Sequence, residues 1–135
     1  MSAEHTETLS YELAALDGSG CRLEIDGAIT LDACQSLLTQ LWEDDEYLKF
    51  RSMLCDLSRC ELPEFNVVLR IAQYIAREKR GRGPTIVAFL SPDFASSTLV
   101  RAFRGFESLV KLKINFFAEH NDAIEWLQSR ESAEA

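Results

Sequence analysis

The residues best placed to do chemistry follow a short apolar segment in the middle of the chain. Residues 53–55 are a continuous apolar run, typical of a central parallel strand, and Asp56-Leu57-Ser58 predicts a turn at its end. Asp56 would then lie at the edge where α/β sheets usually bind ligands; the alternative is a turn carboxylate that accepts nearby backbone amides. Cys60 lies in a polar segment beside Arg59, and a neighbouring cation favours the reactive thiolate. Together, Asp56 and Cys60 support only a weak enzyme hypothesis.

Other patterns that carry chemistry are missing from the sequence. The four cysteines are Cys21, Cys34, Cys55 and Cys60. No two of them are separated by two residues, so we expect structural thiols rather than a metal site. His120 comes near a predicted helix start, where a capping or surface role is typical, and Gly81-Arg82-Gly83-Pro84 precedes a strand rather than opening a phosphate-binding helix. We therefore expect no enzyme, no metal and no cofactor.

Composition and charge narrow the class of protein. A chain of 135 residues with 47% hydrophobic content predicts one globular domain, and the absence of a signal segment or a long apolar run predicts a cytoplasmic protein without an integral membrane segment. Residues 1–50 carry eleven acidic and two basic side chains, whereas residues 51–118 carry six and eleven. This acidic balance disfavours nucleic acid as a partner. The basic cluster Arg77, Lys79, Arg80 and Arg82 is either a solvated helix end or an anion site.

The hydrophobic patterns predict an α/β domain. Strands are expected at 9–16, 21–26, 53–55, 85–90 and 111–117. Helices are expected from Thr30 to about 41, from Pro63 to about 79, from Ser91 past Phe106, and from Asn121 to about 128. The order ββαβαβαβα implies a mostly parallel mixed sheet of about five strands with about four helices. Residues 9–128 form this domain, residues 1–8 a flexible tail and residues 129–135 a frayed tail.

Four segments of the chain together resemble a known family. They are residues 27–32, 54–58, 85–88 and 121–127. They resemble the SpoIIAA-like domains of bacteria, which are similar in fold to the STAS domains of anti-sigma-factor antagonists and distantly to CRAL-TRIO lipid-binding domains. The resemblance covers nearly the whole chain, although each motif is short and mostly apolar. It implies a SpoIIAA-like scaffold and a binding role.

The regulatory residue of the antagonists is missing. In those proteins, a serine at the start of the helix after the Asp-Leu-Ser segment is phosphorylated to disrupt a kinase partner. The corresponding residues here are Glu64, Phe65, Asn66 and Val67, so Phe65 replaces the serine. Without that hydroxyl the phosphorylation switch is lost.

Two binding hypotheses follow. The first is a non-enzymatic interaction or regulatory module that contacts a protein partner, or itself as a homodimer. The second is binding of a small apolar ligand or lipid in a cavity beneath the third predicted helix, although the aromatic spacing there is also typical of plain core. The candidate partner or ligand surface consists of Asp56, Ser58, Glu64, Phe65, Asn66, Ser91, Asp93, Phe94, Phe103 and Phe106.

Overall fold

The computed structural model describes residues 9–16, 18–79 and 81–134. The strands are β1 (Ser10–Ala15), β2 (Gly20–Ala28), β3 (Ser52–Glu61), β4 (Ile86–Leu90) and β5 (Lys113–Phe117). The helices are α1 (Leu31–Trp42), α2 (Asp45–Leu48), α3 (Phe65–Glu78), α4 (Ser97–Val110) and α5 (His120–Glu134), with a 3-10 helix, η1 (Pro92–Ala95), before α4. The predicted α/β class and element order are confirmed, whereas the predicted tail 1–8 lies outside the described residues.

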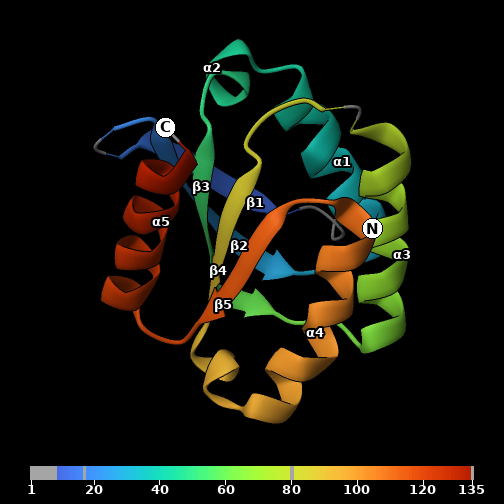
Figure 1. Cartoon of the computed structure of the whole chain (residues 1–135). Helices are drawn as coiled ribbons and strands as arrows, with labels where there is room; N and C mark the ends of the chain where they lie inside the picture. Colours follow the sequence, from blue (N-terminus) through green and yellow to red (C-terminus); the bar gives the residue numbers. More distant parts are fainter. Residues whose placement is uncertain (1–8, 17, 80, 135) are drawn as a thin grey trace.

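The strands form one mixed sheet whose spatial order equals their order in the chain. β1 pairs antiparallel with β2, and β2, β3, β4 and β5 are parallel. Each crossover between neighbouring parallel strands therefore steps in the same direction, and right-handed crossovers of this kind place their helices on the same face. Figure 1 shows this arrangement: α1, α3 and α4 cover one face, and α5 covers the other.

The two faces of the sheet bury separate clusters of apolar side chains. Cys55, Val87 and Ile114 point to the face under α1, α3 and α4 and belong to the larger cluster. Leu54 and Ala88, which alternate with them along the same strands, pack under α5. Strands buried on both faces need the near-continuous apolar runs that the sequence shows here.

The central strand β3 is longer than the sequence predicted. The Asp-Leu-Ser segment is not a turn, because β3 continues through it to Glu61. The pairing register of β2 with β3 shifts between Glu24 and Asp26 of β2. In this interval β3 has one residue more than β2, and pairing resumes where Arg59 lies opposite Asp26. The backbone N–H of Ser58 donates to Asp56 Oδ1 at 2.9 Å, a local bond also typical of turns. This shared preference explains the wrong prediction.

Two helix ends also differ from the prediction. Ser91 caps only the short η1, and a second cap at Ser96, whose hydroxyl accepts from the backbone N–H of Leu99 at 3.2 Å, begins α4. The expected frayed tail is helical as far as Glu134. Glu131 holds this end in place, because its carboxylate accepts hydrogen bonds from the hydroxyls of Ser19 and Ser52.

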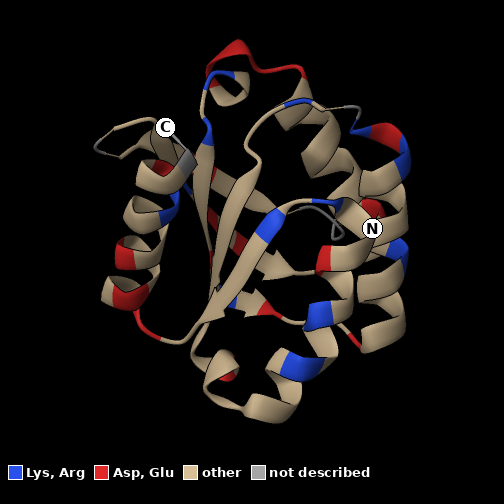
Figure 2. Cartoon of the chain, viewed as in Figure 1, with Lys and Arg blue, Asp and Glu red and all other residues tan. Residues whose placement is uncertain are grey.

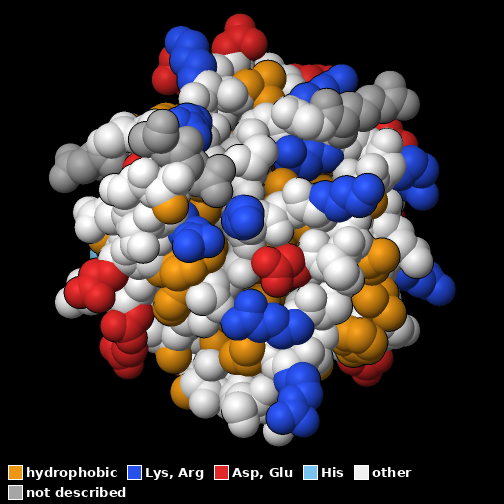
Figure 3. All heavy atoms as spheres, viewed as in Figure 1, with side chains coloured by type: hydrophobic (Ala, Val, Ile, Leu, Met, Phe, Trp, Pro, Cys, Tyr) orange, Lys and Arg blue, Asp and Glu red, His pale blue; other side chains and the backbone are white. Residues whose placement is uncertain are grey.

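Charged side chains are unevenly distributed over the surface. Figure 2 shows acidic positions around α2 and along α5, and basic positions on α4 and β5. The space-filling view shows basic side chains gathered over α4 and β5 (Figure 3). Asp44 is the N-cap of α2, and Asp45 and Glu46 lie in its first turn, where the helix dipole favours acidic side chains. Within the described residues, no helix has the length and apolar character needed to cross a membrane.

Candidate functional site

Asp56 is held inside the sheet rather than exposed at its edge. It is 6% exposed and lies within β3, on the face of the sheet that α5 covers. Its carboxylate accepts from Arg22 at 2.7 Å and from the backbone N–H of Ser58 at 2.9 Å, while Ser58 itself is exposed. Burial acts to raise the pKa of Asp56, but the hydrogen bonds from Ser58 and the Arg22 guanidinium outweigh it and lower that pKa. The structure thus favours the alternative of a locally bonded carboxylate.

Cys60 lies in β3, not in a polar loop. Its thiol contacts the carbonyl oxygen of Ile25 at 3.3 Å. Burial raises the pKa of Cys60 to about 11, and the carboxylates of Asp26 and Asp56 add to the shift. A thiol with so high a pKa stays protonated near neutral pH and is a poor nucleophile. The raised pKa argues against the reactivity that the neighbouring Arg59 suggested, because burial and two carboxylates act against that exposed cation. All four cysteines are free thiols.

The residues predicted around the antagonist serine position lie at the exposed start of α3. Glu64 is the N-cap, with no hydrogen bond from its side chain, and Asn66 is also exposed. The Phe65 side chain is 46% exposed, which is unusual for a large apolar residue. Its ring lies beside Gly105 of α4, where a Cβ atom would come within 3.9 Å of it. Phe65 is thus accessible at the start of α3, and its correspondence to the regulatory serine of the antagonists stays a prediction.

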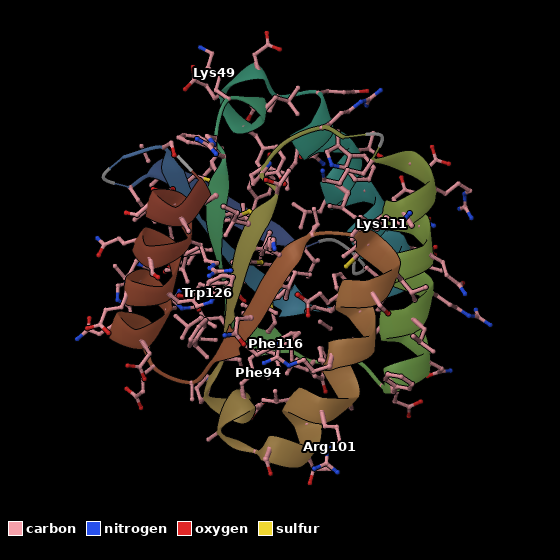
Figure 4. The ribbon with its side chains drawn as sticks, in the orientation of Figure 1. Lys49, Phe94, Arg101, Lys111, Phe116 and Trp126 are labelled. Carbon is pink, nitrogen blue, oxygen red and sulfur yellow. The ribbon has the colours of Figure 1, made fainter. Side chains whose placement is uncertain are left out.

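The predicted aromatic residues separate into core and cavity lining. Phe94 is buried, and its ring centroid lies 5.5 Å from that of Phe103 and 5.1 Å from that of Phe116. Figure 4 shows Phe94 and Phe116 directed toward one another between β5 and η1. Ser91 is buried beneath them as the η1 cap, accepting from the backbone N–H of Asp93 at 3.2 Å, and Asp93 is exposed. Phe94, Phe103 and Phe106 all belong to the buried apolar cluster on this face of the sheet.

An apolar cavity of about 140 Å³ lies between the sheet and the helices α1, α3 and α4. Phe103 and Phe106 line it, as the cavity hypothesis predicted, but Phe94 lies outside the lining. Other lining residues are Leu41, Cys55, Ile71 and Val87. The cavity is therefore not confined to the space beneath α4, which is the third helix of the prediction, but extends beneath α1 and α3.

Lys79, which the sequence placed only in the basic cluster at a helix end, is the cationic residue in the cavity lining. It caps the end of α3, is 8% exposed and lines the cavity together with Tyr47 and Pro84. Burial lowers the pKa of Lys79. The predicted basic cluster is thus divided: Arg77 and Arg82 are exposed, Lys79 is buried, and Arg80 lies outside the described residues. A lysine four residues after the buried Ile75 was the available signal, since that spacing puts both on one helix face.

Metal-binding clusters do not accompany these features in the part of the chain that the structure describes. Over residues 9–16, 18–79 and 81–134, no group of three or more histidine, cysteine, aspartate or glutamate side chains could hold a metal ion. His120 is exposed at the start of α5. What the described residues bring together is an apolar cavity with a buried lysine in its lining.

The sheet order and the helix cover define a SpoIIAA-like fold, and solved structures of that fold are similar to this chain. One is an uncharacterised protein of the DUF3478 family from Shewanella loihica PV-4, with a TM-score of 0.61 and 16% identity over 94% of this chain and 98% of that one. Another is an anti-sigma factor antagonist from Mycobacterium paratuberculosis, with a TM-score of 0.59 and 13% identity over 95% and 99% of the two chains.

A third similar structure is the anti-sigma factor antagonist SpoIIAA in its unphosphorylated form. Its TM-score is 0.53, with 13% identity over 89% of this chain and 97% of that one. No family model matches the sequence, and no curated protein matches it. At identities this low, the structural similarity shows the fold alone, because proteins with unrelated functions can share one fold. The distant similarity to CRAL-TRIO domains stays a prediction.

Proposed function

We propose that this chain is a non-enzymatic binding module that holds a small apolar ligand between its sheet and the helices α1, α3 and α4. The observation that supports the proposal is the cavity of about 140 Å³ with its almost wholly apolar lining. Protein interiors are close-packed, and the voids they contain are usually small. An apolar cavity of about 150 Å³ is large enough to bind benzene, so this one suits a ligand of similar size.

An empty cavity of this size lowers the stability of the protein. The apolar side chains that line it lack packing partners on the side of the cavity, so those contacts are lost to the folded state. A ligand that fills the space regains part of that free energy and stabilises the folded state by mass action. This gain gives an apolar molecule a reason to bind.

A binding role also agrees with the state of the two side chains considered for catalysis. Asp56 is engaged by Arg22 and Ser58, and Cys60 has a pKa raised to about 11. Catalysis requires a nucleophile, a base and an electrostatic stabiliser that converge on one place. Both Asp56 and Cys60 are instead explained by their roles within β3.

Methyl NMR of the protein titrated with toluene tests the proposal. We expect saturable shifts of the Ile71 and Val87 methyl signals, because both residues line the cavity. The methyl signals of Leu127, which packs on the opposite face of the sheet under α5, are the internal control and should stay unchanged. Equal shifts on both faces, or none at saturation with toluene, would contradict ligand binding in the cavity.

A second candidate function is protein interaction through the start of α3. The observation that favours it is Phe65, whose side chain is 46% exposed at the position of the antagonists' regulatory serine. A pull-down that compares the natural chain with Phe65→Ser tests this role, and Leu109→Ser, at another exposed apolar residue, is the matched control. We expect a specific partner to be lost with Phe65→Ser alone. Equal recovery by all three proteins would contradict it.

A further inference from the structure

We propose that the ligand of the cavity is a small monocarboxylic acid whose apolar body fills the cavity and whose carboxylate pairs with Lys79. The proposal rests on the proposed function and adds to it the chemical class of the ligand. A molecule of this class combines the two properties of the cavity lining, an extended apolar surface and one buried cation.

The first argument is the position of Lys79. Its side chain lines the cavity, and only 8% of the residue is exposed. Lysine can bury its apolar stem while its ammonium stays at the surface, and the Lys79 ammonium keeps contact with water in this way. Among the carboxylates that the structure describes, none forms an ion pair with Lys79. A carboxylate in the cavity would supply the missing partner.

The end of α3 does not account for this burial by itself. The helix dipole favours a cation at its C-terminus, and Lys79 is the C-cap of α3. That interaction is available equally to an exposed lysine, as Arg77 on the last turn illustrates. Burial lowers the pKa of Lys79, so its charge is less well solvated than that of the exposed Arg77. The dipole therefore explains a charge at this position but not the apolar surroundings of the side chain.

The segment after Lys79 fixes this end of the cavity. The backbone N–H of Arg82 donates to the carbonyl of Lys79 at 3.1 Å. Gly83, with φ of 76°, lies so close to Tyr47 that an added Cβ would come within 2.8 Å of the Tyr47 ring. Tyr47 and Pro84 are buried there and also line the cavity. The lysine is thus held against a well-packed wall rather than on a loose loop.

The dimensions and charge of the site restrict the ligand further. Because an apolar cavity of about 150 Å³ holds benzene, a body of roughly six carbon atoms fits this one, and a long-chain fatty acid would need the helices to move apart. One lysine matches the single charge of a carboxylate. A phosphate carries up to two charges and is usually bound by several donors, often including arginine. Hexanoate is therefore the appropriate probe.

A fluorescence titration with hexanoate and its uncharged analogue 1-hexanol tests the proposal. Trp42 lines the cavity and reports on binding, and Trp126→Phe removes the other tryptophan, which packs against Phe117 on the α5 face. The test variant in this background is Lys79→Met, which keeps the length and apolar stem of the side chain. The matched control is Lys49→Met, because Lys49 is 72% exposed and points away from the body of the molecule (Figure 4).

We expect the natural Lys79 protein to bind hexanoate at least tenfold more tightly than 1-hexanol. Lys79→Met should weaken hexanoate binding at least tenfold and leave 1-hexanol binding equal or tighter, which also shows that the variant is folded. Lys49→Met should change neither. If 1-hexanol binds as tightly as hexanoate, or if Lys79→Met leaves their ratio unchanged, the carboxylate assignment is overturned while apolar ligand binding stands. If neither probe binds, both proposals are overturned.

Discussion

Filling the cavity with an additional methyl group should stabilise the ligand-free protein. Val87 of β4 is 2% exposed and lines the cavity, so Val87→Ile extends a β-branched side chain into empty space without changing its strand preference. Burying one more methylene contributes about 0.8 kcal/mol, and the free energy of unfolding should rise by about that amount. Val68→Ile on α3, at 3% exposure, should give a similar gain from the opposite wall, since isoleucine forms helices at least as well as valine. Urea unfolding followed by circular dichroism measures both changes.

The same substitution at a well-packed position is the control. Val110 of α4 is 6% exposed and belongs to the same apolar cluster, but it does not line the cavity. Val110→Ile should therefore overpack the core and destabilise the protein by about 1–3 kcal/mol. Toluene binding should weaken in Val87→Ile and stay unchanged in Val110→Ile. If both variants are destabilised equally, and the slope of unfolding free energy against urea concentration is unchanged, the cavity has no room for a methyl group beside Val87.

Three further results are expected. Asp56→Asn should lower the free energy of unfolding by only about 1 kcal/mol at neutral pH, since solvent screens the pair with the partly exposed Arg22. Folding lowers the pKa of Asp56 from 3.8, so its stabilising contribution is present above that value and is lost as the pH falls below it. Urea unfolding should therefore show a larger effect of the substitution at pH 7 than at pH 3. Glu131→Ala should remove the hydrogen bond from Ser52 and lower the free energy of unfolding by about 1–2 kcal/mol. Amide hydrogen exchange in the last turns of α5 should become faster. Unchanged exchange would show that the contact does not hold the helix end. In the folded protein, Cys60 should react with iodoacetamide at pH 8 more slowly than the free amino acid cysteine does. After unfolding, its rate should equal that of free cysteine. Fast labelling of Cys60 in the folded chain would contradict a pKa of about 11.

The fold was predictable because its signals are local and repeated. The uncharged run at β4, the alternation along β2 and the caps at Thr30 and Ser91 each indicated an element that the structure contains. The end of β3 was not predictable in the same way, since the bulge depends on pairing with β2. Likewise, the helical end of α5 depends on Glu131 reaching Ser19 and Ser52, which lie 112 and 79 residues away in the sequence.

The candidate site was predictable only in part, for a related reason. Phe103 and Phe106 follow from helical spacing on one element, and both line the cavity. A cavity, however, is the space left between several elements, and no single segment encodes its volume. Lys79 was grouped with its neighbours in a basic cluster because charge runs usually lie in solvent. Its burial at the cavity depends on residues from other segments, such as Tyr47 and Pro84, that share the lining with it only in the folded structure.

The separate cover of the two sheet faces has a consequence for folding during protein synthesis. The helices α1, α3 and α4 alternate with the strands in the chain, so one face of the sheet is covered as each strand leaves the ribosome. The other face, with Leu54, Ile86 and Leu90, is covered by α5, which follows all five strands. Until Ala123 and Leu127 of α5 emerge, that apolar surface stays open to water and to neighbouring chains. A nascent chain stalled after β5 should therefore depend on chaperones far more than one stalled after α5.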